Sequence, residues 1–283
     1  MTRGIQFPMF APQTEWVMPD GLKDLTGYKE IAIDLETNDP GLITSGSGSV
    51  VGRGHIAGIA VAVEGWSGYY PIQHENGGNI DKKLVFGWLQ EILNQENTTF
   101  IFHNAMYDVC WLRAAGLIIK GKIVDTMIAA SLVNENRFKF DLNSLAKEYV
   151  GIGKDENVLR IAAKDFGVDP KAEMWRMPAM YVGEYAERDA EVTLKLWQRL
   201  SIELHNEELM DIFNLETKLF PCLVDMRFKG VRVDLEHAAK LKKNLIIRED
   251  KILKNIKDLV GFDIEINAAR SIAKGFDKLK LPY

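Results

Sequence analysis

The sequence has few of the residues that mark a disulfide-rich, membrane-spanning or strongly basic protein. Its two cysteines, Cys110 and Cys222, lie far apart and form neither a Cys-x-x-Cys zinc pair nor a disulfide framework. No apolar run approaches the roughly 18 residues that a membrane-spanning helix needs. The N-terminal residues lack the apolar core of a signal peptide. These absences favour reduced thiols, a cytoplasmic location and no membrane partner.

Charge and size narrow the possibilities further. The net charge of −5 argues against broad electrostatic binding to duplex DNA, although it leaves room for a local basic groove. A chain of 283 residues, 47% hydrophobic and 27% charged, can bury one large core and part of a second. The composition changes near residue 205, where lysine-rich helical segments begin, so we expect one domain over residues 1–205 and a helical segment over residues 206–283.

Hydrophobic periodicity predicts an α/β fold, a mixed sheet flanked by helices. Residues 41–54, rich in Gly and Ser, are expected to form a mobile loop. Strands are expected over residues 29–35, 56–63, 68–72 and 98–102, and helices over residues 81–94, 106–115, 125–133, 142–149, 180–204 and 235–259.

The first strand carries two acids with the spacing of one sheet face. Asp34 and Glu36 are two residues apart, so their side chains project to the same side, while Ile31, Ile33 and Leu35 face the other. A half-exposed strand with solvated acids would show the same alternation. The pair ends its strand, however, and ligands often bind just beyond strand ends.

Two further acids stand in apolar surroundings. Asp108 follows the strand at 98–102 and begins a helix, where an acid is also favoured by the helix dipole alone. Asp189 is the only charge within the apolar arc of the helix at 180–204, with Tyr185 one turn before it. A buried acid bonded to a backbone group or to the tyrosine is the alternative for Asp189. The other arc is expected to be solvated, and it holds Glu184, Glu187, Arg188, Glu191 and Lys195.

Buried carboxylates are costly unless something compensates their charge, and a hard cation such as Mg²⁺ is the usual partner for several of them. Two such ions a few Å apart form a common site for phosphodiester hydrolysis.

Other motifs in the sequence lack the structural context that their function needs. A G-x-G-x-x-A match at 52–57 precedes a strand instead of opening a helix, and His74-Glu75 lacks the second histidine of a zinc protease.

Three motifs together resemble a known family. Asp-x-Glu-Thr at 34–37, Asn-x-x-Tyr-Asp at 104–108 and Tyr-x-x-x-Asp at 185–189 are similar, in order and spacing, to the exonuclease motifs of the DEDDy branch of DEDD exonucleases. The segments at 124–127 and 140–146 resemble connecting segments of the proofreading domain of family A, DNA polymerase I-like, DNA polymerases. Residues 215–234 and 266–279 resemble the entry to the polymerase region and the start of its thumb.

The resemblance implies a ribonuclease H-like fold and metal-dependent 3′-5′ hydrolysis of single-stranded DNA, such as a frayed primer end. It implies that Asp34, Glu36 and Asp189 hold one Mg²⁺ or Mn²⁺ ion, and that Asp34 bridges to a second ion supported by Asp108. Tyr185 would orient the attacking water. Thr37 and Asn104 match positions that contact the terminal nucleotide, although a strand-end turn residue and a helix N-cap are their simpler roles.

The chain lacks counterparts of the family's palm and fingers, so we expect no polymerase activity from it alone. We expect either one piece of a split polymerase, working with a second polypeptide that carries those parts, or a natural or engineered fragment, in a bacterium or a phage-infected cell. Two alternatives stay open: a stand-alone RNA-trimming exonuclease of the same superfamily, and a docking module without catalysis.

The helix expected at 235–259 has too many apolar positions for a free solvated helix. They are Leu241, Leu245, Ile246, Ile252, Leu253, Ile256 and Leu259.

Overall fold

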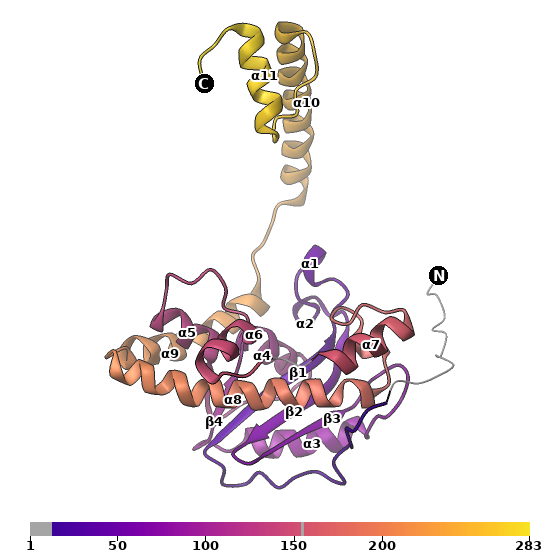
Figure 1. The fold of residues 1–283 in the computed structure, drawn as a ribbon, viewed down its shortest axis with the longest axis vertical. Helices are drawn as coiled ribbons and strands as arrows, with labels where there is room; N and C mark the ends of the chain where they lie inside the picture. The colour runs from indigo at the N-terminus through magenta and orange to yellow at the C-terminus, as the bar shows by residue number, and fades with distance from the viewer. Residues whose placement is uncertain (1–12, 154–155) are drawn as a thin grey trace. The chain divides into compact units, whose positions relative to one another are not determined.

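The computed structural model describes residues 13–153 and 156–283, which form two compact units (Figure 1). One unit runs to Phe228 and the other from Lys229 to Tyr283. The first unit contains a five-stranded sheet. Its strands are β1 (Glu30–Asn38), β2 (His55–Val63), β3 (Trp66–Pro71), β4 (Thr99–Phe102) and β5 (Lys122–Asp125).

The sheet is mixed, in the order β3-β2-β1-β4-β5. Strand β1 lies at its centre, antiparallel to β2 and parallel to β4, while β3 pairs antiparallel with β2 and β5 pairs parallel with β4. The parallel crossover from β1 to β4 passes through the hairpin of β2 and β3 and a helix. This topology confirms the expected mixed sheet.

Helices surround the sheet in the first unit. The longest of them, α8, runs across one face of the sheet, and α3 lies on the other (Figure 1). The helices are α1 (Leu42–Ser45), α2 (Gly48–Val51), α3 (Lys82–Leu93), α4 (Ala105–Ala114), α5 (Thr126–Val133), α6 (Leu142–Leu145), α7 (Asn157–Phe166), α8 (Gly183–Asn206) and α9 (Met210–Lys229), with a π-helical turn at Ala146–Val150 and 3₁₀ turns at Met174–Arg176 and Ala179–Tyr181.

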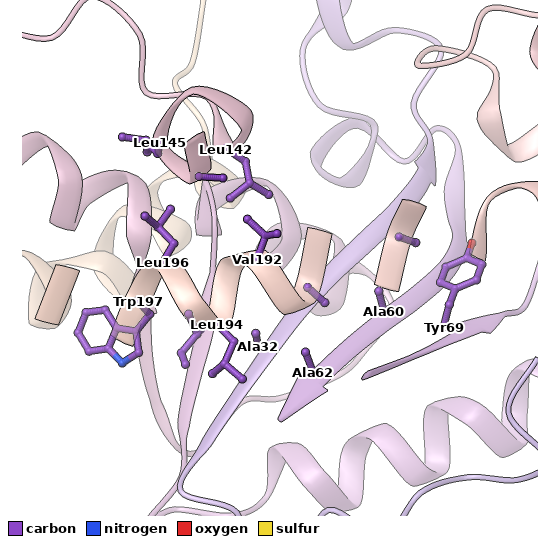
Figure 2. Packing of buried hydrophobic residues seen from close by; sticks show 14 of the residues in the cluster. Ala32, Ala60, Ala62, Tyr69, Leu142, Leu145, Val192, Leu194, Leu196 and Trp197 are labelled. Atoms are coloured by element: carbon purple, nitrogen blue, oxygen red, sulfur yellow. The ribbon is translucent and has the colours of Figure 1, made fainter. Parts of the chain in front are cut away.

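The two faces of the sheet carry side chains of different size. Large aliphatic residues of β1, such as Ile31, Ile33 and Leu35, pack against α3 and α4. The face toward α8 presents Ala32, Ala60 and Ala62, beside Tyr69 of β3 (Figure 2). Alanine has no side chain beyond Cβ, so α8 packs close to the strands. The core positions of α8 include Val192, Leu194, Leu196 and Trp197.

The second unit consists of two helices. Helix α10 (Leu235–Val260) begins at Asp234, whose side chain accepts a hydrogen bond from the backbone of His237. It ends at Gly261, a left-handed C-cap, and is followed by α11 (Ala269–Leu279). Ile264 packs against Gly275 of α11, where an added Cβ would approach it to 2.6 Å.

Some elements differ from the sequence expectation. Strand β5 and helix α7 were not expected, and the stretch at 41–54 contains the short helices α1 and α2. Helix α9 packs on the first unit through Phe213, Phe220 and Val224, so that unit extends beyond residue 205. Whether the exonuclease-like domain itself ends at residue 205 remains a prediction. No helix in the described part of the chain is long and apolar enough to cross a membrane.

Candidate active site

Strand β1 positions the first two acids of the candidate site. Asp34 lies opposite Ala60 of β2, and Glu36 lies opposite Gly58. Both acids are half-buried, and both project toward α8 because they share the register of Ala32. The ladder shifts register between Glu36 and Thr37, so a β-bulge or similar irregularity directly follows the second acid.

Asp108 reaches the same strand from helix α4. Its carboxylate Oδ1 accepts a hydrogen bond of 3.2 Å from the backbone N–H of Leu35, the residue between the two acids of β1. Asp108 is only 4% exposed. Burial, and then the negative charge of Asp34, raise the pKa of Asp108 well above its usual value. Asp108 is thus a buried carboxyl group that lies near the charge of Asp34.

Asp125, at the end of β5, holds the start of α4 in place. Its carboxylate accepts hydrogen bonds from the backbone N–H groups of Asn104, Ala105 and Met127, at 3.0, 2.8 and 2.8 Å. Asn104 stands at the N-cap position with φ +63°, in the left-handed region, and its side chain makes no capping hydrogen bond. Asn104 thus occupies the N-cap position, as its simpler role expects, but the Asp125 carboxylate accepts the hydrogen bonds of the backbone N–H groups there.

Helix α8 brings the remaining acid and the tyrosine. Asp189 is 5% exposed, and Tyr185 lies one turn earlier on the same side of the helix. Burial, and then the negative charges of Asp189, Glu36 and Asp34, raise the pKa of Tyr185. These charges act on Tyr185 because α8 crosses the face of β1 from which the two strand acids project.

The five predicted residues Asp34, Glu36, Asp108, Tyr185 and Asp189 thus come together from β1, α4 and α8. Among residues 13–153 and 156–283, no three His, Cys, Asp or Glu side chains are already arranged as a metal-binding group. Like charges repel in the absence of a cation. The donor set, oxygen from carboxylates in a partly buried setting, fits a hard divalent ion. Metal binding by these four acids stays a prediction.

Thr37 lies just beyond the acids and makes a specific side-chain contact. Its Oγ1 lies 2.5 Å from the hydroxyl of Tyr107, which donates a 3.3 Å hydrogen bond to Asp39. Asp39 accepts in turn from the backbone N–H of Gly48, at the start of α2. Tyr107 therefore connects the end of β1 to the glycine-rich stretch. A nucleotide contact by Thr37 or Asn104 stays a prediction.

Three polar residues beside the site were not singled out as site residues from the sequence. Glu187, expected on a solvated arc, is half-buried and accepts hydrogen bonds from the indole of Trp16 and the backbone N–H of Tyr69. The Tyr69 hydroxyl lies 2.7 Å from Nε2 of the buried His74. The hydrogen bonds of Glu187 have no signal in local sequence, because they join elements distant along the chain.

Comparisons with known proteins agree with this geometry. A family model described as a 3′-5′ exonuclease, that of family A DNA polymerases, matches residues 11–205. A DNA-directed DNA polymerase of Pseudomonas phage M6 is 34% identical over 271 residues, which cover 93% of this chain and 40% of the phage protein. The chain therefore spans well under two thirds of the length of that relative.

Solved structures show the same fold. The POL domain of Pol1 from M. smegmatis, in complex with DNA primer-template and dNTP, matches 91% of this chain and 39% of that chain, with a TM-score of 0.63 and 16% identity. Brucella melitensis NrnC with bound Mg²⁺ matches 75% of this chain and 92% of that chain, with a TM-score of 0.53 and 19% identity.

The role of Asp125 leads to a stability prediction. In Asp125→Ala, three backbone N–H groups at the start of α4 and α5 lose their acceptor, and we expect a loss of about 2–4 kcal/mol in the free energy of unfolding, measured by urea denaturation. The matched control is Asp141→Ala, which removes an exposed N-cap of α6 bonded to the backbone of Ser144. That control should lose about 0.5–2 kcal/mol. Equal losses in the two variants would contradict the assigned role of Asp125.

Proposed function

Because the chain belongs to the family of 3′-5′ exonuclease domains of family A DNA polymerases, we propose that it removes nucleotides from the 3′ end of single-stranded DNA, as a proofreading activity. The supporting observation is that four carboxylates and one tyrosine, distant in sequence, meet where α8 crosses β1. Acids that only face solvent do not need to converge at the buried contact between a helix and a strand.

Divalent ions would be held by the same carboxylates. We propose that Asp34, Glu36 and Asp189 hold one ion and that Asp34 and Asp108 hold a second, with Mg²⁺ or Mn²⁺ as the candidates. Bound ions supply a nucleophilic hydroxide at neutral pH and stabilise the charge on the leaving oxygen. The raised pKa of Asp108 supports this proposal, because a cation would relieve the repulsion between Asp108 and Asp34.

Side chains of the protein would position the attacking water and the terminal nucleotide. The Tyr185 hydroxyl, kept protonated by its raised pKa, would hydrogen-bond the attacking water and align it with the terminal phosphate. Water attacks phosphorus, the bond from phosphorus to the 3′ oxygen of the preceding nucleotide breaks, and that oxygen takes up a proton. The products are a 5′-mononucleotide and a DNA strand one nucleotide shorter. Thr37 and Asn104 would contact the terminal nucleotide, and base stacking would provide affinity without sequence preference.

A polymerase region is the proposed partner of the second unit. Helix α10 exposes large apolar side chains, among them Leu245 at 53%, Ile247 at 58% and Leu259 at 68% exposure. Exposed apolar surface on this scale is typical of an interaction site. We propose that this stripe packs against the palm and fingers of a family A polymerase, inside a bacterial or phage-infected cell.

The first prediction is the activity itself. With Mg²⁺ or Mn²⁺, the protein should shorten a 5′-labelled single-stranded DNA from its 3′ end and release 5′-mononucleotides, and EDTA should stop the reaction. Asp34→Ala should abolish the activity and keep the cooperative thermal melt, because it removes a carboxylate that repels its neighbours. Faster shortening of RNA than of DNA would favour the RNA-trimming alternative, and intact substrate throughout would favour a docking module.

The second prediction concerns the tyrosine of α8. Tyr185→Phe keeps the ring and its packing but removes the hydroxyl, so we expect the single-turnover rate to fall by about 10- to 10³-fold. Tyr149→Phe, on the π-helical turn outside the site, is the matched control and should keep the wild-type rate. A wild-type rate in Tyr185→Phe would remove the hydroxyl from the mechanism.

The third prediction concerns the stripe on α10. The chain should co-elute in size-exclusion chromatography with a separately produced polymerase region of the related phage polymerase. Leu245→Lys combined with Ile252→Lys should abolish co-elution, because lysine cannot be buried there without a partner charge. The exposed Lys251→Ala should leave co-elution unchanged. Separate elution of the wild-type chain would disprove the proposed contact.

A further inference from the structure

The hydroxyl of Tyr69 lies beside Glu36, one of the acids proposed to hold a metal ion, on the face of the sheet that carries the candidate site. Tyr69 belongs to β3 and lies opposite Ala60 of β2, and its ring leans over Gly58. A Cβ added at Gly58 would lie 2.1 Å from the Tyr69 hydroxyl oxygen. The hydroxyl therefore occupies the space that a side chain of Gly58 would fill.

The sheet register then fixes which acid the hydroxyl meets. Gly58 lies directly opposite Glu36 in the antiparallel pair of β1 and β2. Side chains at directly opposite positions project to the same face, with Cβ atoms about 4.5–5.5 Å apart. The Tyr69 hydroxyl therefore takes the place on β2 where a side chain of residue 58 would lie next to Glu36. Its position requires glycine at residue 58.

The hydrogen bonds of His74 determine where the Tyr69 proton points. Nδ1 of His74 lies 2.9 Å from the carbonyl oxygen of Met177, and a carbonyl only accepts, so Nδ1 carries the ring proton. His74 is 4% exposed, and its burial lowers its pKa to about 4, so the ring is neutral at physiological pH. Nε2 is then an acceptor, and Tyr69 donates to it over 2.7 Å.

This arrangement leaves the Tyr69 oxygen as an acceptor facing the site. The single hydroxyl proton is used by His74, and the Glu36 carboxylate also only accepts. A water molecule can donate one hydrogen bond to each of these two acceptors. Burial, and then the charges of Glu36 and Asp34, raise the pKa of Tyr69 well above its usual value, so the phenol remains protonated.

Helix α8 also holds Tyr69, through the backbone N–H group of that tyrosine. The backbone N–H of Tyr69 donates a 2.9 Å hydrogen bond to Glu187, which also accepts from the indole of Trp16 at 2.8 Å. Glu187 lies on α8 midway between Tyr185 and Asp189. Tyr69 is thus fixed to α8 through its backbone and to the Met177 carbonyl through its hydroxyl and His74.

We propose that Tyr69, oriented by His74, is a positioning residue of the metal site. Its hydroxyl oxygen accepts a hydrogen bond from a water ligand of the divalent ion that Glu36 would hold. The hydrogen bond fixes the orientation of that water and of the Glu36 carboxylate. This inference rests on the proposed function, since it requires that the acids bind a divalent ion.

The test measures Mn²⁺ binding to the whole protein without nucleic acid, from the electron paramagnetic resonance signal of free Mn²⁺. We expect Tyr69→Phe to bind Mn²⁺ about 10- to 100-fold more weakly than wild type, the usual effect of losing a group that orients a metal ligand. The matched control is Tyr70→Phe. The Tyr70 hydroxyl accepts from the backbone of Lys23 and donates to that of Gly21, on the opposite face of the sheet, so this variant should bind Mn²⁺ as wild type does.

A double mutant separates orientation by His74 from a general loss of packing. His74→Leu alone should also weaken Mn²⁺ binding, because it frees the Tyr69 proton to turn toward Glu36. In the Tyr69→Phe background the same change should weaken binding no further, because the hydroxyl is already absent. A full additional loss would show that His74 acts through packing.

The outcomes distinguish this inference from the proposed function. If the wild-type protein binds no Mn²⁺, the metal site itself is wrong. If the wild type binds Mn²⁺ and Tyr69→Phe binds it equally well, the proposed function stands and the role of Tyr69 is overturned. An equal loss in Tyr69→Phe and Tyr70→Phe would also overturn it, because the loss would then follow from any missing tyrosine hydroxyl in β3.

Discussion

The close packing of helix α8 on the alanine-lined face of the sheet is the contact on which the candidate site depends. Because Ala32, Ala60 and Ala62 add no side chain beyond Cβ, the helix lies directly against the strands. Asp189 and Tyr185 are carried on this helix, while the other acids are fixed to β1. A larger side chain at any of the alanines would push α8 outward and separate the two halves of the site.

The same packing concentrates negative charge in a partly dry environment, which costs free energy. The rest of the fold offsets that cost in two ways. The opposite face of the sheet buries large aliphatic and aromatic residues, such as Ile33 and Phe100, that contribute hydrophobic stability. Backbone N–H groups also anchor the acids or their elements: Leu35 donates to Asp108, and the start of α4 donates to Asp125. These backbone donors hold Asp108 against β1 and fix the start of α4 beside it.

Local patterns predicted the elements that carry the acids, and the reason is periodicity. In both β1 and α8, apolar residues recur at the spacing that places them on one buried face. The positions of Asp34, Glu36 and Asp189 in the structure follow from these spacings. Strand β5 was missed because only Ile123 and Val124 of its four residues favour a strand, whereas all four residues of the equally short β4 are β-branched or aromatic. Glu187 was misassigned because its partners, Trp16 and Tyr69, are 171 and 118 residues away. A long-range hydrogen bond leaves no local pattern.

The neighbouring residues Tyr69 and Tyr70 show how the face of a strand decides the role of a side chain. They are identical in chemistry, yet strand geometry points them to opposite sides. Tyr70 packs in the aliphatic core, and its hydroxyl bonds to irregular backbone at Gly21 and Lys23. Tyr69 enters the alanine layer, where only the missing side chain of Gly58 leaves space for its hydroxyl. The small residues that let α8 approach the sheet thus also admit a polar group to the charged end of β1. Packing and chemistry therefore constrain the same positions on this face.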